Sequence, residues 1–292
     1  MNKTVTGAMA LMGACAISIG GPALAAGSVD GASAEHEVAS AGPVHVLLGV
    51  RLWANQWDMV VATRELILTN PADPSSLMGR DRIFSTPSST EIMPIVYLGL
   101  RYGKFIGSAS YFAKTSFDTG GVLSEDVDRD EIDVNIGYHV TPNLVASLGY
   151  RRGTQSKTTD FAPDSKSALE GVLLGASFSV PVSGPFSAYG SVAYGIARVT
   201  VEDQPLANGD DSLDGEYRVA EIGFSYNLSH LLGGSVLKGA ALTAGYRTWV
   251  VTEDNVPIGT YELDDPLHPV SLDEIKLRTA ADGFVIGAVA VF

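Results

Sequence analysis

Four short repeats combine a glycine and an arginine at the same spacing. They are Gly49-Val50-Arg51, Gly99-Leu100-Arg101, Gly149-Tyr150-Arg151 and Gly245-Tyr246-Arg247. Residues two apart on a β-strand share a face, so the glycine and the arginine of each repeat point to the same side. We expect each missing side chain to leave space for a long guanidinium. Such arginines could select solutes by charge or pair with carboxylates.

Three acidic residues have the matching alternation in neighbouring segments, namely Glu131, Asp133 and Glu221. If Val140 lies opposite Leu144 across a short turn, Asp133 lies opposite Arg151. Directly opposed residues have Cβ atoms only about 4.5–5.5 Å apart, which is close enough for an ion pair. The register therefore predicts an Asp133–Arg151 contact.

The second predicted contact depends on a later hairpin. If Leu228 lies opposite Ala240, Glu221 lies opposite Arg247. These charges have two interpretations. They could form a charged constriction that selects small solutes or ions by sign, or a self-neutralising polar core that fills a narrow barrel and conducts little.

Two acidic runs could bind hard divalent cations, which prefer oxygen ligands. We expect both in extracellular loops: Asp126, Asp128 and Asp130 in the first, and Asp210, Asp211 and Asp214 in the second. The first run is not an EF-hand, because Glu131 takes the place of the turn glycine and Gly137 that of the bidentate glutamate. The alternative is a solvated acidic rim. The sequence identifies no definite metal site and no cofactor.

Catalytic groups are sparse on the expected outer side. His268 is near Asp264 and Asp265, and an Asp–His pair could activate water. His268 lies in a long loop between Leu267 and Pro269, however, rather than on a rigid strand. We therefore expect no enzymatic activity.

Segments of about ten residues must position these side chains. Residues 131–140 show the pattern most clearly, because apolar and polar residues alternate with a period of two, as in a strand with one apolar face. Ten segments are predicted as strands: 44–57, 92–102, 104–113, 131–140, 144–152, 168–180, 186–200, 215–228, 240–252 and 282–292.

The connections between these segments alternate in length. The gaps near Gly103, 141–143, 181–185 and 229–239 are short, whereas 58–91, 114–130, 153–167, 201–214 and 253–281 are longer. Short turns at one rim and long loops at the other are typical of outer-membrane barrels. We therefore predict an all-β fold, a closed antiparallel up-and-down transmembrane β-barrel of about ten strands. Eight or twelve strands remain open, because residues 60–61, 65–69 and 275–279 could add or extend strands.

The first residues predict export. A cationic start at Lys3, an apolar stretch and the small residues Ala23 and Ala25 indicate a signal peptide over residues 1–25. Residues 26–43 are predicted to be a flexible leader, and residues 44–292 the barrel. The single cysteine, Cys15, lies within the signal peptide, so we expect no disulfide in the mature protein.

The net charge of the chain limits the classes of partner that it can bind. The net charge of −14 argues against nucleic-acid binding, which relies on Lys and Arg to neutralise phosphates. It permits membrane insertion, because the acids cluster between the apolar segments. Outer-membrane lipid and lipopolysaccharide are the expected partners.

Residues 137–144 (GYHVTPNL), followed by Leu148-Gly149-Tyr150-Arg151, form a segment similar to hairpins of many small outer-membrane barrels. The terminal strand that ends in Phe292 fits the same group. Over its mature length the chain resembles Gram-negative outer-membrane β-barrel proteins. The resemblance implies the outer membrane and a structural or narrow, weakly conducting barrel. The alternatives are a surface-interaction barrel acting through acidic loops and, third, an outer-membrane hydrolase.

Overall fold

The computed structural model describes residues 44–68, 70, 77–118, 126–158, 165–202, 206–228, 237–262 and 269–292. The predicted signal peptide and leader lie outside these residues. Eleven strands are present: β1 (His45–Leu68), β2 (Leu77–Pro87), β3 (Glu91–Tyr102), β4 (Phe105–Asp118), β5 (Asp126–Thr141), β6 (Leu144–Thr158), β7 (Ser165–Ser183), β8 (Phe186–Glu202), β9 (Ser212–Asn227), β10 (Gly239–Glu262) and β11 (Pro269–Val291). No helix in this part of the chain is long and apolar enough to cross a membrane.

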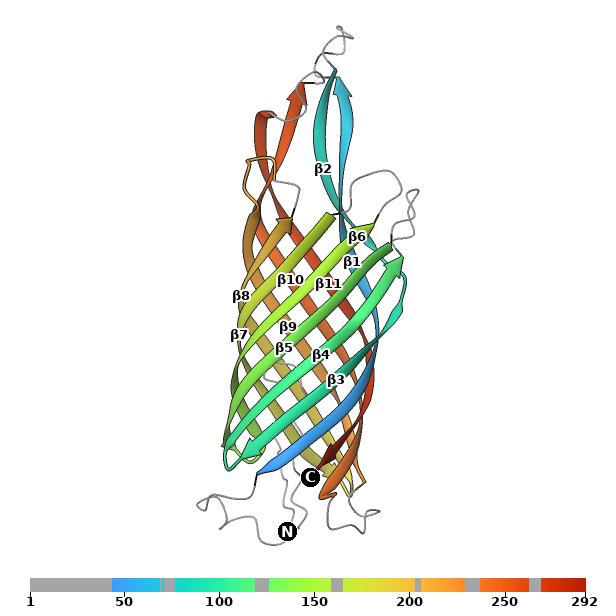
Figure 1. The fold of residues 1–292 in the computed structure, drawn as a ribbon, viewed down its shortest axis with the longest axis vertical. Coiled ribbons are helices and arrows are strands. Elements are labelled where there is room, and N and C mark those ends of the chain that lie inside the picture. The colour runs from blue at the N-terminus through green and yellow to red at the C-terminus, as the bar shows by residue number, and fades with distance from the viewer. Residues whose placement is uncertain are drawn as a thin grey trace, which may run out of the picture.

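Ten of the strands close into an antiparallel up-and-down barrel (Figure 1). Each strand from β3 to β11 pairs with the next along the chain. The lower part of β1 closes the ring, because residues 47–58 pair with β11 and residues 45–55 pair with β3. The predicted fold class is confirmed, and eight and twelve strands are excluded. Closure satisfies the backbone hydrogen bonds that an open edge would leave unpaired in lipid.

The eleventh strand, β2, lies beyond one end of the barrel. The upper part of β1 continues to Leu68 and pairs with β2 over residues 58–68 and 77–87. Near its start, β2 also pairs with β10, where Thr260 lies opposite Arg80. The first predicted loop, 58–91, thus consists largely of paired strand, and the strand suggested at 60–61 and 65–69 is confirmed as far as Leu68, the last residue described there.

Other strands are also longer than predicted. The loop expected at 114–130 is wrong, because β4 continues to Asp118 and β5 begins at Asp126. The loop expected at 253–281 shortens in the same way, since β10 ends at Glu262 and β11 begins at Pro269. Outside lipid a strand no longer needs an apolar face, so the pairing continues where the hydrophobic alternation has stopped.

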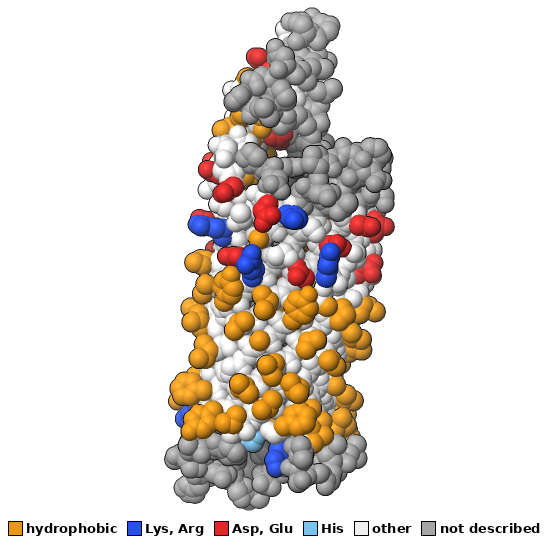
Figure 2. Space-filling model, viewed as in Figure 1, with side chains coloured by type: hydrophobic (Ala, Val, Ile, Leu, Met, Phe, Trp, Pro, Cys, Tyr) orange, Lys and Arg blue, Asp and Glu red, His pale blue; other side chains and the backbone are white. Residues whose placement is uncertain are grey.

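The barrel surface carries a broad apolar belt (Figure 2). It includes the exposed side chains Leu48, Val50, Leu52, Val96, Leu98, Leu100, Ile132, Val134, Ile136, Val172, Leu174, Ile222, Phe224, Phe284 and Ile286. Charged side chains gather above it. On β10 and β11 the outward positions change from Tyr246 and Phe284 to Thr248 and Asp282, which marks the outer edge of the belt. The predicted lipid-facing side is confirmed.

Aromatic residues occupy both edges of the belt. Phe105 packs against Tyr138 near the lower rim, with ring centroids 5.3 Å apart. Tyr246 packs against Phe284 near the upper edge, with centroids 5.2 Å apart. Such aromatic girdles match the two membrane–water interfaces.

The start of β1 and the C-terminus lie at the lower rim (Figure 1). There Phe292 pairs with Val46: the Phe292 amide donates to the Val46 carbonyl at 2.9 Å, and the Val46 amide donates back at 3.3 Å. The lower rim also carries tight turns at Gly103 and Gly184, whose φ angles of 57° and 54° favour glycine. By the usual asymmetry of these barrels, this rim is the periplasmic one.

Candidate functional site: the charged core of the barrel

Two hairpin registers place the predicted ion pairs inside the barrel. Asp133 lies opposite Arg151 on β5 and β6, and Arg151 Nη2 is 2.6 Å from Asp133 Oδ2. Glu221 lies opposite Arg247 on β9 and β10, with Arg247 Nη1 3.2 Å from Glu221 Oε2. Both predicted contacts are confirmed, and all four side chains are buried.

Glu221 also reaches across the barrel. Its Oε1 forms an ion pair with Arg51 Nη2 on β1, and both side chains are only 2% exposed. One carboxylate therefore serves two guanidiniums. We call Arg51, Glu221 and Arg247 the lower cluster.

Four charges on β5 and β6 form a second group, which we call the upper cluster: Arg129, Glu131, Asp133 and Arg151. Arg129 pairs with Glu131, with Nε 2.7 Å from Oε1. Arg151 Nη1 is 3.7 Å from Glu131 Oε2 and donates a hydrogen bond to the Tyr217 hydroxyl at 2.6 Å. Two cations and two anions are thus joined in one network.

Arg129 was not among the predicted core residues. It shares the alternation of Glu131 and Asp133, and this parity could have identified it. The strand predicted from the sequence begins at residue 131, so Arg129 falls in the preceding predicted loop, 114–130. The structure instead buries Arg129 against two indole rings, with its guanidinium carbon 4.3 Å from the ring centroids of both Trp57 and Trp249. A cation held over aromatic faces in this way is stabilised by their quadrupoles.

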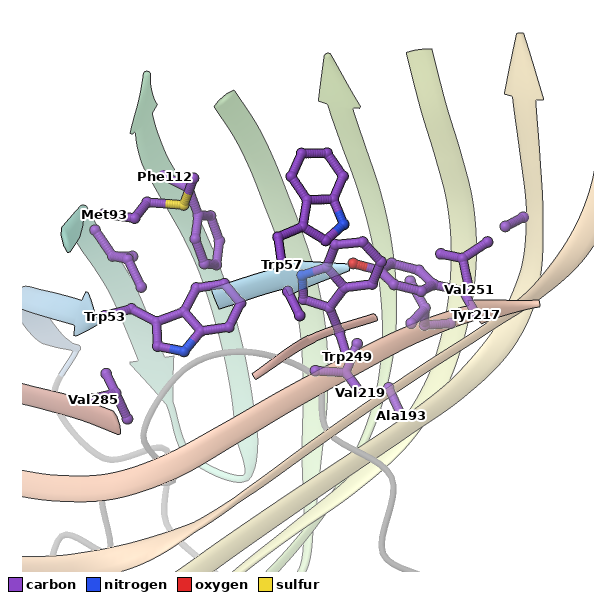
Figure 3. Close-up of a cluster of buried hydrophobic side chains, with 14 of the residues drawn as sticks. Trp53, Trp57, Met93, Phe112, Ala193, Tyr217, Val219, Trp249, Val251 and Val285 are labelled. Carbon is purple, nitrogen blue, oxygen red and sulfur yellow. The ribbon is translucent and has the colours of Figure 1, made fainter. Parts of the chain in front are cut away.

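Large aromatic side chains fill the barrel around the charges (Figure 3). Trp53, Trp57 and Trp249 are at most 3% exposed. Trp249 packs edge-on against Tyr217, with centroids 5.7 Å apart, and lies 6.0 Å from Trp57. Trp53 and Trp57 share the alternation of Arg51 along β1, and both side chains lie inside the barrel. The barrel interior at this level is a packed core.

The expected role of the repeated glycines is wrong in detail. A Cβ on Gly49 would meet Val289 at 2.9 Å, and one on Gly245 would meet the Tyr189 hydroxyl at 2.7 Å, rather than the arginine of the same repeat. Residues two apart on a strand are separated by about 6.6 Å, so inward side chains meet neighbours on adjacent strands. The glycine that makes room for Arg51 is Gly287 on β11, where a Cβ would lie 2.6 Å from Arg51 Cγ.

Arg101 does not join either cluster. It lies near the end of β3 at the lower rim, partly exposed, and its Nε donates to the Gly103 carbonyl at 3.3 Å. Its place in the network predicted from the Gly-x-Arg pattern is therefore wrong. Arg101 lies at the lower end of β3, opposite His45 at the start of β1, and therefore below the level of the two clusters.

The acidic residues proposed as cation ligands are divided between strands and a loop. Asp126, Asp128 and Asp130 lie on β5 and Asp214 on β9, whereas Asp210 and Asp211 precede β9. The loop expected around the first run is thus wrong. Among the described residues, no group of three or more His, Cys, Asp or Glu side chains is placed to hold a metal ion.

Several of these acids have partners above the belt. Asp128 accepts from Ser116 and pairs with Lys114 at 2.7 Å, and these contacts lower the pKa of the carboxyl. Asp130 accepts from Thr154. Asp214 pairs with Arg198 at 3.0 Å. These contacts link neighbouring strands at the outer rim.

Two histidines of the described residues, His45 and His139, lie on β1 and β5 near the lower rim, away from the expected outer side. His268, Asp264 and Asp265 lie outside the described residues.

Residues 95–238 match the family model of the OmpA-like transmembrane domain. This segment runs from β3 past the end of β9. A comparison with curated protein sequences finds no match.

Solved structures give distant matches. The outer-membrane protease OmpT from Escherichia coli is 11% identical, with 86% of this chain and 97% of that chain covered and a TM-score of 0.44. The Pseudomonas putida toluene transporter TodX is 9% identical, with 87% and 90% covered and a TM-score of 0.30. A Pseudomonas aeruginosa FadL homologue is also 9% identical, with 85% and 90% covered and a TM-score of 0.30. Similarity at this level carries no information on activity.

The closed barrel, the apolar belt and the family match over β3 to β9 agree with one another. The chain is a bacterial outer-membrane β-barrel protein.

Proposed function

We propose that this protein is a non-enzymatic, structural barrel of the outer membrane whose lumen conducts ions weakly or not at all. The main support is the core at the level of Trp57 and Trp249. Both rings are buried and pack against the Arg129 guanidinium, each with its centroid 4.3 Å from the guanidinium carbon.

The lower cluster supports the same proposal. Glu221 on β9 binds Arg247 on the neighbouring strand β10 and Arg51 on β1, which is three strands away around the wall, so ion pairs pass through the barrel interior. An ion moving through this section would have to separate charges that are nearly free of contact with water. Breaking a buried pair of this kind costs about 3–5 kcal/mol.

Lack of catalysis is also part of the proposal. The buried acids in the belt region, Glu131, Asp133 and Glu221, are each held by at least one arginine. A general base or nucleophile needs access to substrate as well as a suitable environment. These carboxylates are paired with arginines and buried away from solvent, so their arrangement favours a structural role.

Planar-bilayer recording of the refolded protein tests the proposal. We expect wild-type protein to give no channel events or rare, small ones. The double variant W57A/W249A removes both rings around Arg129 and should give frequent, larger steps. The matched control Tyr150→Ala removes an aromatic side chain from the lipid face and should behave as wild type does.

Large, regular steps from the wild type would contradict a closed lumen. If Arg51→Gln and Arg247→Gln then shifted the ion selectivity, the narrow-channel form of the function would replace the structural one. Heat-modifiable migration in SDS gels separates unfolded variants from folded, silent ones.

A second candidate is surface interaction, supported by the strands that rise above the belt. The β1–β2 and β10–β11 hairpins contact each other there: Asp81 accepts from the Gly259 amide at 3.1 Å, and Arg80 pairs with Asp273 at 3.3 Å. Val270 and Leu272 on β11 are 54% and 50% exposed in this region.

Adhesion of bacteria to immobilised matrix proteins, and phage adsorption, test this second candidate. Cells with wild-type protein should bind, and a V270S/L272S variant at equal surface level should bind several-fold less. Equal binding by cells that lack the protein would rule the candidate out for those partners.

A further inference from the structure

The two charge clusters differ in net charge. The upper cluster contains two arginines and two acids and is balanced. The lower cluster contains Arg51 and Arg247 but only Glu221. Within the described part of the barrel core, four buried arginines thus face three buried acids, and one positive charge is in excess.

This excess cannot be removed by loss of a proton. An arginine stays charged in proteins because its pKa exceeds about 12. One further buried acid, Glu253 on β10, is six positions beyond Arg247, or about 20 Å along the strand, and is too far away to balance it. Burying a charge without a partner is very costly. Among the described residues, no buried acid is therefore left to balance the lower cluster.

Arg247 has a free side for such a charge. Its Nη1 faces Glu221, whereas Nε and Nη2 have no hydrogen-bond partner among the described residues. These two groups form one edge of the planar guanidinium, the fork that receives anions through two parallel hydrogen bonds. The side chain is 1% exposed, so bulk water does not replace the missing partner.

Trp53 supplies a further donor next to Arg247. The Arg247 guanidinium carbon is 5.4 Å from the Trp53 ring centroid, and the buried Trp53 Nε1 has no partner among the described residues. Phe112 lies on the same guanidinium, with its centroid 5.2 Å away. Donors held among aromatic rings favour a small, weakly hydrated anion over a bulky one.

We propose that the barrel core binds one small monovalent inorganic anion, such as chloride, at the free edge of Arg247. One negative charge balances the one excess positive charge. A water molecule could accept the hydrogen bonds but would leave the charge uncompensated. The site does not depend on whether the lumen conducts, since an anion can be enclosed while the barrel folds.

Urea unfolding of the refolded protein in detergent tests the site. Chloride is exchanged for gluconate, which is too large for the core, at constant ionic strength so that screening is unchanged. A ligand that binds only the folded state at about ten times its Kd reduces the unfolded fraction about elevenfold. We therefore expect the wild-type urea midpoint to rise with chloride. A midpoint equal in both salts would overturn the proposal.

Substitutions at two buried positions are expected to change the chloride response in opposite directions. Arg247→Gln removes the fork and leaves Arg51 balanced by Glu221, so the chloride response should vanish. Glu221→Gln raises the excess to two positive charges, so the response should be larger than in wild type. Arg152→Gln is the control, because Arg152 pairs with Glu170 on the exposed surface at 3.3 Å and should leave the response unchanged.

If Arg247→Gln does not fold, Glu221→Gln and a direct measurement decide the question. Crystals grown in bromide should show an anomalous peak beside Arg247 Nε and Nη2. A chloride response that persists in folded Arg247→Gln, or bromide-grown crystals without this peak, would show that the anion does not bind there.

Discussion

The two charge clusters follow the same register rule but differ in charge balance. The upper cluster joins two arginines to two acids, with Arg151 bound to Asp133 at 2.6 Å and to the Tyr217 hydroxyl, although Arg151 Nε has no partner among the described residues. The lower cluster joins two arginines to the single acid Glu221, and Arg247 keeps two N–H groups without a partner among the described residues. Opposed positions on a hairpin thus bring charges together. Whether each cluster is electrically neutral depends on charges from other strands of the barrel, such as Arg51 on β1.

The largest effect is expected where the balanced cluster is broken. Asp133→Asn removes the closest partner of Arg151 and leaves a buried, uncompensated guanidinium. Loss of one partner from a buried pair costs about 3–5 kcal/mol. The unfolding free energy in detergent, measured by urea titration, should fall by this amount.

The matching change in the lower cluster sharpens the comparison. At high chloride, Glu221→Gln should cost less than Asp133→Asn, because an anion can replace the lost charge. Equal costs for the two substitutions in chloride and in gluconate would show that the clusters do not differ in this way.

Glu253 presents a third case, a buried acid without an opposing cation. It lies above the belt on β10, is 6% exposed, and its neighbours in register are Gly215 and Leu277. Burial raises the pKa of this carboxyl to about 7, against 4.5 in an unfolded chain. The folded protein therefore binds this proton more tightly than the unfolded chain does.

Stability should consequently fall as the pH rises from about 4.5 to about 7. The contribution of Glu253 is fully present below the lower value and is lost above the upper one. The difference amounts to about 3 kcal/mol. Glu253→Gln should flatten this part of the pH profile of the unfolding free energy. An unchanged slope in the variant would mean that Glu253 is not the group responsible.

A smaller effect is expected from the hydroxyl that completes the upper cluster. Tyr217→Phe removes the hydrogen bond from Arg151 at 2.6 Å but keeps the ring against Trp249. A hydrogen bond to a charged group contributes about 1.5–3 kcal/mol. The unfolding free energy should fall by about 2 kcal/mol. Tyr246→Phe, whose hydroxyl contacts Asp282 at the exposed edge, is the control and should lose less.

The sequence predicted the parts of the core that follow from local pairing. A short turn at residues 141–143 and a period of two predict Asp133 opposite Arg151. In the structure Thr141 lies opposite Leu144, and a register shift between His139 and Thr141 preserves the Asp133–Arg151 pairing. The same rule placed Trp53 and Trp57 inside. These predictions require only neighbouring strands, so errors in the strand ends did not affect them.

The remaining contacts depend on closure and cannot be derived from a hairpin. Arg51 meets Glu221, 170 positions away in the chain, because the pairing of β1 with β11 closes the barrel and leaves only β10 and β11 between β1 and β9. Arg129 was missed for a different reason. Beyond the belt both faces of a strand become polar, so hydrophobic alternation no longer shows that pairing continues.

The smallest effect is expected from an exposed ion pair that resembles the buried ones in composition. Arg152 and Glu170 lie 3.3 Å apart on β6 and β7, with side chains 54% and 46% exposed. Water solvates both charges whether or not they pair, so Glu170→Gln should lower the unfolding free energy by less than about 1 kcal/mol. Added salt should reduce even this difference, whereas the cost of Asp133→Asn should hardly change, because screening acts weakly on buried charges. If Glu170→Gln were as costly as Asp133→Asn, burial would not be the property that separates the core pairs from those on the surface.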